Sequence, residues 1–404
     1  MKDATNAAKV GERGSVEGPV RKEFLAFGRP ALEEGEILEV VETMRSGWLG
    51  TGPRVSRFEE AFRRHTGSGH ALALNSCTAG LHLSLIAAGV GPEDEVITTP
   101  MTFAATANAV VHTGAIPVFV DVDHRSQNID PSLIEAAITP RTRAIIPVHF
   151  AGRPCEMDRI MAIASKHGLR VIEDAAHAIE AIHHGRPVGT IGDAGCFSFY
   201  VTKNIITGEG GMVVTDNDEW ADKIQTYGLH GLSKGAWKRY GDEGFIHYQV
   251  LYPGFKYNMT DMQAAIGIHQ LARIERYARR RREIWARYEE AFRDLPAERP
   301  APEEPDTVHA RHLYTLLLDA DRLGVSRDAV AEELRLEGIG TGIHFISLHL
   351  HPYYRDRFRL SPEDFPISRS ISERTLSLPL SARLSDQDVD DVIAAVRKVL
   401  LRHC

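Results

Sequence analysis

Short apolar runs rich in β-branched residues recur in the first half of the chain and predict strands. Seven such runs fall between about residues 71 and 216, and they read ALALN, EVITT, IPVFVDV, AIIPVHF, RVIED, CFSFY and GMVVT. Between most of them the apolar positions recur at helical spacing, as in residues 78–88 and 157–167. This alternation predicts a doubly wound α/β sheet, whose ligands belong at the carboxyl ends of the strands.

The pattern changes near residue 260. The sequence TDMQ at residues 260–263 is typical of a capping box, and a helical pattern with a basic run at residues 279–282 continues to about residue 295. We therefore expect one long connecting helix. A stretch rich in proline and glutamate, residues 296–305, ends it.

The remaining residues predict a smaller α+β unit. A strand is expected over residues 313–318, a helix over residues 327–336, then another strand and an amphipathic helix from residue 386 to about 401. The expected organisation is a flexible N-terminal extension (1–24), a large domain (25–270) and a small C-terminal domain that includes the connecting helix (271–404).

The composition narrows the function classes. The chain has 404 residues, 43% of them hydrophobic and 25% charged, with a formal net charge of −8. That charge argues against nucleic acid or an anionic membrane as the main partner. The first 22 residues contain no apolar stretch, and no segment approaches ~18 uninterrupted apolar residues, so we expect a cytoplasmic protein without a membrane partner. The four scattered cysteines predict free thiols and no structural zinc.

Lys203 is the first candidate for chemistry. It follows the predicted strand CFSFY and precedes the glycine-rich turn at residues 208–211. Burial would lower the pKa of a lysine in this position toward the neutral amine that carbonyl chemistry needs. Considered alone, a surface lysine whose stem packs on the protein is the more frequent explanation.

Asp174 changes that balance, because it ends the predicted strand RVIED at the ligand-binding edge of the sheet. A buried aspartate there can keep the ring nitrogen of pyridoxal 5′-phosphate (PLP) protonated, as the cofactor's electron-sink chemistry requires. A helix cap is the alternative role for Asp174. His177 could lie near the ring or its 3-oxygen, or could be a core histidine.

A phosphate and a ring would need further residues. The sequence NSCTAG at residues 75–80 lies at a strand-to-helix junction, where backbone N–H groups and a hydroxyl can bind an anion. Ser198 offers a second hydroxyl at another strand end, and Phe103 could stack on a pyridine ring. The alternatives are ordinary capping hydroxyls and a core aromatic residue.

In combination these residues resemble the DegT/DnrJ/EryC1/StrS family of sugar aminotransferases, from about Phe27 to the C-terminal helix. The similarity is carried by SGWLGTGP (46–53), EDAAH (173–177), Ser198 with Lys203 and Asn204, GEGG (208–211) and GFKYNMTDMQAA (254–265).

The resemblance implies a fold-type-I PLP enzyme with a seven-stranded, mostly parallel sheet in its large domain. It also implies a role for each candidate: Lys203 forms the Schiff base with PLP, Asp174 faces the ring nitrogen, His177 lies near the ring oxygen, Phe103 stacks on the ring, and Thr78, Ala79 and Ser198 hold the phosphate.

The resemblance further implies a homodimer with shared sites, in which Asn258 reaches the phosphate bound by the neighbouring subunit. Lys256 is a second candidate for that position, because many members of the family read G-x-N-x-R where this chain has GFKYN.

The substrate expectation also rests on resemblance. Residues 338–345 and 353–358 are similar to the enzymes that make UDP-4-amino-4-deoxy-L-arabinose, which favours amino transfer from an amino acid, expected to be L-glutamate, to a nucleotide-linked 4-keto sugar. Phe103, where that relative has a tryptophan, and the loop at residues 346–351 depart from the pattern. The alternatives are a C3 aminotransferase of a dTDP- or GDP-linked 3-keto sugar and a non-catalytic PLP-binding regulator.

Two other enzyme classes fit less well. His344, His349 and His351 could ligate zinc, but no carboxylate or thiolate joins them at a recognised spacing, so no metal is expected. The chain also lacks the G-x-G-x-x-G and G-x-x-x-x-G-K-[ST] motifs that would hold a dinucleotide or a nucleoside triphosphate.

Overall fold

The computed structural model describes residues 18–233 and 248–404, and its central element is a seven-stranded sheet in the order β1-β9-β8-β5-β4-β2-β3. Strands β2, β3, β4, β5 and β8 pair in parallel, whereas β9 is antiparallel to both β1 and β8. All seven predicted strands and the α/β class are thereby confirmed. The strands are β1 (His70–Leu74), β2 (Glu95–Thr98), β3 (Ile116–Phe119), β4 (Thr142–Ile145), β5 (Arg170–Asp174), β8 (Ala194–Ser198) and β9 (Gly211–Thr215).

Helices cover both faces of this sheet. Successive residues of a strand point to opposite faces, and on β9 Val213 packs in one hydrophobic cluster while Met212 and Val214 pack in another. Burial on both faces explains why the strands read as continuous apolar runs. The Val213 face carries α3 (Cys77–Ala87), α4 (Ala104–His112) and α7 (Asp218–Gly228), and the opposite face carries α2 (Pro53–Thr66), α6 (Met157–His167) and α8 (Asp261–Ala272).

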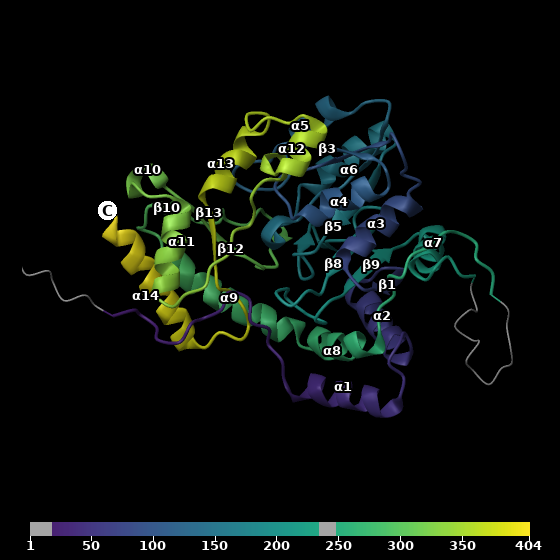
Figure 1. Ribbon diagram of the computed structural model, residues 1–404, viewed down its shortest axis with the longest axis horizontal. Helices are drawn as coiled ribbons and strands as arrows, with labels where there is room; N and C mark the ends of the chain where they lie inside the picture. The colour runs from purple at the N-terminus through teal and green to yellow at the C-terminus, as the bar shows by residue number, and fades with distance from the viewer. Residues whose placement is uncertain (1–17, 234–247) are drawn as a thin grey trace, which may run out of the picture.

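A second, antiparallel sheet forms a separate core near the C-terminus. Its strands have the order β10-β12-β13, and α9 (Ile274–Ala291), α11 (Arg327–Leu336) and α14 (Asp386–Arg402) pack against it. In Figure 1 this sheet lies to the left of the large sheet, and α8 and α9 run between the two below them. Its strands are β10 (Ala297–Glu298), β12 (Tyr314–Leu318) and β13 (Thr375–Leu378).

The predicted connecting helix is two helices. Thr260 and Gln263 form the expected capping box at the start of α8. At Arg273, however, the backbone leaves the helical conformation (φ −107°, ψ 5°), and α9 begins at the next residue. The guanidinium of Arg273 pairs there with Glu33 and Glu36 from the N-terminal part of the chain. The expectation of one continuous helix to residue 295 was therefore wrong.

The N-terminal segment packs on the C-terminal core. Residues 1–17 of the extension expected to be flexible lie outside the described residues. The amide of Val20 donates to the Glu337 carboxylate (2.9 Å), and Arg21 pairs with Asp391 (2.8 Å). Leu25 bridges Ile339 and belongs to the cluster around β12, so residues 20–25 contact the region assigned to the small domain.

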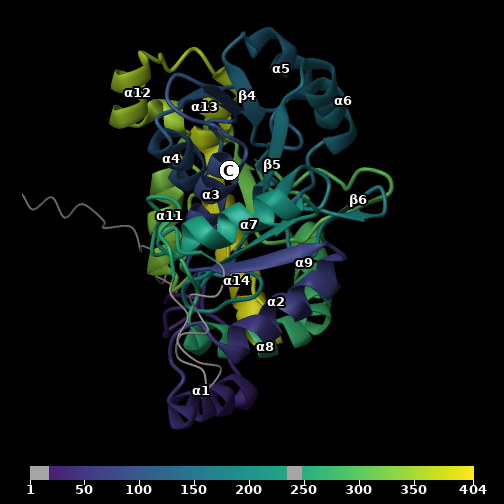
Figure 2. The ribbon, with the colours of Figure 1, turned by 90° about the vertical axis from the view of Figure 1, so that its right-hand side faces the viewer.

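The remaining elements are short or peripheral. A small three-stranded sheet has the order β11-β6-β7, and Figure 2 shows β6 at the right-hand edge of the molecule, on the side that carries α6. Among the described residues, no helix combines the length and the apolarity needed to cross a bilayer. The short or peripheral elements are α1 (Glu34–Ser46), α5 (Pro131–Ile134), β6 (Ile182–His183), β7 (Arg186–Pro187), β11 (Thr307–Val308), α10 (Ala320–Leu323), α12 (Pro352–Phe358) and α13 (Pro366–Arg374).

Candidate active site

A cavity of about 620 Å³ opens where β2, β4, β5 and β8 end. This is the position at which a doubly wound sheet binds ligands. Six of the eight predicted site residues line the cavity: Thr78, Phe103, Asp174, His177, Ser198 and Lys203. Ala79 lies buried in the first turn of α3, next to a lining residue. Asn258 does not line the cavity of its own chain.

Asp174 is the last residue of β5, and it is 5% exposed. Its carboxylate accepts hydrogen bonds from the hydroxyl of Thr106 (2.7 Å) and from the amide of Ala176 (3.2 Å). Burial raises the pKa of Asp174, and the hydrogen bonds and the nearby charge of Lys203 oppose that shift only in part. Among residues 18–233 and 248–404 no cation forms an ion pair with this carboxylate, and a protonated ring nitrogen would supply one.

Lys203 lies on the turn that follows β8, where its amide donates to the carbonyl of Tyr200 (2.9 Å). Lys203 lines the cavity and is half-buried. Burial lowers the pKa of Lys203 to about 8, against the opposing effects of Cys77 and Asp174. At that value a substantial fraction of the amine is neutral near physiological pH, as a nucleophilic amine requires.

His177 follows β5 by three residues and presents an unsatisfied nitrogen. Its residue is 8% exposed, and Nδ1 is buried without a hydrogen-bond partner. Burial and the charge of Lys203 lower the pKa of His177 well below its usual range, which keeps the ring neutral. An unpartnered polar atom in a cavity is a place where a ligand can bond.

The N-terminus of α3 faces the cavity beside Ser198. Ser76 caps this helix, because its hydroxyl accepts from the amide of Ala79 (3.1 Å), and Thr78 lies in the first turn. The start of β9 passes so close that a Cβ on Gly211 would lie 2.4 Å from the amide nitrogen of Cys77, which only glycine avoids. A helix N-terminus and two hydroxyls suit the phosphate of PLP.

Phe103 immediately precedes α4 at the edge of the cavity. Its residue is 64% exposed, and its ring centre lies 6.2 Å from that of Phe345. Exposure of so large an apolar surface beside a cavity leaves a face available for a flat ligand. Stacking on the cofactor ring remains a prediction for this residue.

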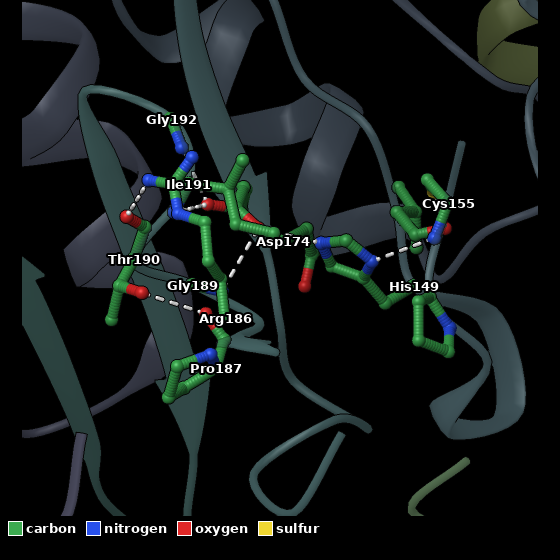
Figure 3. Close-up of polar contacts among 12 residues, drawn as sticks. His149, Cys155, Asp174, Arg186, Pro187, Gly189, Thr190, Ile191 and Gly192 are labelled. Atoms are coloured by element: carbon green, nitrogen blue, oxygen red, sulfur yellow. Dashed lines mark hydrogen bonds and ion pairs between the residues drawn. The ribbon is translucent and has the colours of Figure 1, made fainter. Parts of the chain in front are cut away.

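Glu173, directly before Asp174, anchors the end of β5. Its fully buried carboxylate accepts from the amides of Gly189 (2.8 Å), Ile191 (2.7 Å) and Gly192 (2.7 Å), and from Nε2 of His149 (3.1 Å). Nδ1 of His149 in turn accepts from the amide of Cys155 (3.0 Å), which fixes the tautomer. Figure 3 shows these glycines on one side of Asp174 and His149 with Cys155 on the other.

Burial alone would raise the pKa of Glu173, but the hydrogen bond and charge of His149 and the two glycine amides hold it below the usual range. The carboxylate is therefore ionised, and each of its oxygens accepts two hydrogen bonds. In the sequence Glu173 stands within EDAAH without a predicted role, although its position beside Asp174 was a usable signal.

A second polar group lines the cavity from other parts of the chain. Asn204 donates to Glu180 (2.6 Å) and accepts from Nδ1 of His312 (2.9 Å), while buried Arg281 pairs with Glu180. Neither His312 nor Arg281 was predicted: His312 belongs to no local motif, and the basic run at residues 279–282 did not indicate that Arg281 reaches the cavity.

The three histidines considered for zinc do not converge. Nδ1 of His344 bonds to Ser377 (2.8 Å), Nδ1 of His349 bonds to Ser347 (2.8 Å), and His351 contacts the carbonyl of Ile346 (3.2 Å). Within residues 18–233 and 248–404 they form no common ligand set. His344 instead lines the cavity, where burial and the charge of Lys203 lower its pKa to about 4. All four cysteines are free, as expected.

Known proteins are similar to this chain over nearly its whole length. A model of the DegT/DnrJ/EryC1/StrS aminotransferase family matches residues 30–397. The spore coat polysaccharide biosynthesis protein SpsC of Bacillus subtilis (strain 168) is 51% identical over 381 residues, which are 94% of this chain and 98% of that protein.

Solved structures are similar over the same length. The putative sugar aminotransferase Spr1654 of Streptococcus pneumoniae, in its PMP form, superposes with a TM-score of 0.88 at 33% identity, over 94% of this chain and 100% of that one. It is also known in a PLP form. DesI, crystallised in the presence of its TDP-sugar product, gives a TM-score of 0.84 at 34% identity, over 95% of each chain.

These matches confirm the fold-type-I architecture, the dependence on PLP and the aminotransferase class of the enzyme. The matched residues 30–397 span all three sheets. The chain belongs to the DegT/DnrJ/EryC1/StrS aminotransferase family.

Proposed function

We propose that this enzyme transfers an amino group from L-glutamate to C4 of a nucleotide-linked 4-keto sugar, giving a 4-amino sugar nucleotide. The observation that carries the proposal is that Lys203 and Asp174 line one cavity and have pKa values shifted in opposite directions by burial. PLP chemistry requires two groups: a partly neutral amine and a buried carboxylate that can face the ring nitrogen.

When bound, PLP supplies a conjugated ring that accepts electrons from the Cα of the amino donor. Lys203 then takes the proton from that Cα, since its pKa of about 8 matches proton transfer near neutral pH. Asp174 keeps the ring nitrogen protonated, with Thr106 holding its carboxylate in place. His177, neutral and with Nδ1 free, donates to or accepts from the ring oxygen.

The phosphate end is assigned to three residues. The amides and the Thr78 hydroxyl at the N-terminus of α3 bind the phosphate, together with the hydroxyl of Ser198. Ala79 lies in the same turn and helps to shape the phosphate site, because its amide donates to the hydroxyl of the capping residue Ser76. Phe103 covers the outer face of the ring.

The choice of C4 rests on the similarity of residues 338–345 and 353–358 to the enzymes that make UDP-4-amino-4-deoxy-L-arabinose. His344 and Phe345 from the first segment line the cavity beside His177. Tyr353 of the second segment is 51% exposed and available to a substrate that projects outward.

We also propose a homodimer with shared sites. Asn258 lies outside the cavity of its own chain, and its amide donates to the hydroxyl of Thr51 (2.7 Å). In the preceding residues, Trp48 and Leu49 expose 49% and 50% of their surfaces, as residues of an interface do. Contact with a second subunit would cover them and bring Asn258, with Lys256 as the second candidate, to the neighbouring phosphate.

The test is a panel of acceptors. The pyridoxamine form of the enzyme is mixed with UDP-, GDP- and dTDP-linked sugars that carry a 4-keto or a 3-keto group, and the products are identified by mass spectrometry and NMR. We expect turnover with a 4-keto sugar and regeneration by glutamate. Reaction with 3-keto sugars alone would establish the C3 alternative, and loss of turnover in Lys203→Ala is the control for the assigned amine.

A further inference from the structure

Three potential metal ligands meet on the surface, away from the active-site cavity. Asp158 lies in the first turn of α6, and His183 and His184 belong to the β6–β7 hairpin. One ligand atom from each lies within 4.8 Å of the other two, and none of the three lines the cavity. We propose that these residues form a binding site for a divalent transition-metal ion of the Zn²⁺ class.

The distances suit such an ion. Bonds of about 2.0–2.2 Å place neighbouring ligand atoms of a tetrahedral zinc site roughly 3.3–3.6 Å apart. Nε2 of His183 lies 3.5 Å from Oδ2 of Asp158. Nδ1 of His184 lies 2.6 Å from the same oxygen, at hydrogen-bond distance. The side chains of His184 and Asp158 are 51% and 66% exposed. They can therefore move apart to the ligand spacing of a zinc site without disturbing the core.

The nitrogen of His183 is the independent observation. This residue is 6% exposed, and its Nε2 atom is buried without a hydrogen-bond partner. A buried polar atom left unbonded is destabilising. Oδ2 of Asp158, at 3.5 Å, is too far away for a good hydrogen bond but at the distance expected across a shared metal ion.

The backbone fixes both imidazoles on one side of the hairpin. Residues 184 and 185 form a two-residue turn between β6 and β7, with φ values of 47° and 78°. Glycine adopts such values readily, whereas a non-glycine residue such as His184 is uncommon there. The rings of His183 and His184 stack with their centres 4.1 Å apart.

The donor set selects the class of ion. Two imidazoles and one carboxylate suit Zn²⁺, Co²⁺, Ni²⁺ or Cu²⁺, whereas Mg²⁺ and Ca²⁺ prefer an all-oxygen shell. Exposure of His184 and Asp158 leaves room for water as a fourth ligand. The ion would tie α6 to the hairpin, two residues before Gly189, whose amide bonds Glu173. Its role is therefore structural support for the loop behind Asp174.

Calorimetry on the full-length, PLP-loaded enzyme tests the site. The protein is stripped of metals with a chelator and titrated with ZnCl₂. We expect one ion per chain, and at least a tenfold loss of affinity in Asp158→Asn and in His184→Ala, because each change removes one ligand. Saturating Zn²⁺ should raise the Tm of the unmodified enzyme by about 5 °C and that of Asp158→Asn by much less.

The matched control is His167→Ala, which removes an imidazole that also pairs with a carboxylate, Glu135 (2.9 Å), but has no second histidine beside it. This variant should bind Zn²⁺ like the unmodified enzyme. His183→Ala is a further test, and the two exposed ligands carry the experiment if that buried change prevents folding. A dissociation constant above roughly 100 μM, or equal affinity in Asp158→Asn, His184→Ala and the unmodified enzyme, would overturn the proposal.

Discussion

The hydroxyl of Thr106 donates a hydrogen bond of 2.7 Å to Oδ2 of Asp174, and both residues are buried against the cavity. This contact joins the first turn of α4 to the end of β5. The hydroxyl of Thr102 lies 2.8 Å from that of Thr106 and supplies the hydrogen bond that Thr106 accepts. The orientation of the carboxylate is thus set by a chain of two threonines.

Replacing Thr106 by Val removes this donor and keeps the β-branched shape. The hydrogen bond lowers the pKa of Asp174 against the effect of burial, so its loss should raise that pKa further. The interaction of the Asp174 carboxylate with the cofactor ring should then be weaker. We expect a loss of about 1–2 kcal/mol, or roughly 5- to 30-fold in PLP affinity, measured by absorbance titration of the apoprotein.

The matched control is Thr113→Val, at the other end of α4, where the hydroxyl donates to the carbonyl of Val110 (2.7 Å). PLP affinity should be unchanged in that variant. If Thr106→Val binds PLP and responds to pH like the unmodified enzyme, the hydroxyl does not support Asp174.

Replacing Lys203 by Met should stabilise the apoprotein while abolishing turnover. Burial lowers the pKa of Lys203 from 10.5 to about 8, so at pH 7 the folded state holds an ammonium that the unfolded state solvates better. The shift corresponds to about 3 kcal/mol of unfolding free energy. Removal of the charge should recover that amount.

The stability difference between Lys203→Met and the unmodified apoprotein should change with pH in a defined direction. Between pH 8 and 10.5 the unfolded chain binds more protons than the folded one, so the stability of the apoprotein with Lys203 rises with pH. The advantage of Lys203→Met is therefore complete below pH 8 and disappears above pH 10.5. Urea denaturation at several pH values measures it, and a difference that does not change with pH would contradict the assigned pKa.

Replacing Glu173 by Gln should destabilise the whole protein. Oε1 accepts from two backbone amides, and Oε2 accepts from one amide and from His149. An NH₂ group in place of either oxygen would therefore face only hydrogen-bond donors. Loss of one partner in such a buried, charge-assisted network costs about 3–5 kcal/mol. Because the pKa of Glu173 is lowered, this stability is present above the unfolded-state value and is lost as the pH falls through the folded one.

The control is Glu219→Gln, which removes an exposed charge paired with Lys223 (2.8 Å) and should change the unfolding free energy by less than about 0.5 kcal/mol. Urea midpoints of both variants provide the comparison. Equal midpoints for Glu173→Gln and Glu219→Gln would show that the amides do not depend on the carboxylate.

Local patterns predicted most of the fold. The seven runs became strands because burial on both faces demands apolar residues at every position, and TDMQ became a helix start because its side chains bond the neighbouring amides. No local sequence pattern indicated the break between α8 and α9 at Arg273. It occurs where Arg273 meets Glu33 and Glu36, some 240 residues earlier in the chain.

In the candidate active site, too, local sequence patterns predicted some residues, whereas others depend on long-range contacts. Asp174 ends β5 and Lys203 follows β8, so their meeting at one edge could be inferred from the order of the elements. Thr106 reaches Asp174, and His312 reaches Asn204, through contacts across 68 and 108 residues that no local spacing encodes. The meeting of Asp158 with His183 depends likewise on how a hairpin packs beside α6.

Mixed dimers test whether Asn258 serves the neighbouring subunit. Lys203→Ala alone should be inactive, and Asn258→Ala alone should bind PLP weakly. In a dimer of one chain of each kind, a shared arrangement makes one site that has both Lys203 and Asn258 and one that has neither. In an unshared arrangement each site carries one defect.

Random mixing of equal amounts makes half of the dimers mixed, so a shared site predicts about a quarter of the unmodified activity. Activity no greater than the mean of the two parent variants would assign Asn258 to its own chain, where its amide already bonds Thr51. Because Asn258 lies outside the cavity bounded by its own Lys203, recovery of activity is the expected outcome, and it would explain why Trp48 and Leu49 stand exposed in the isolated chain.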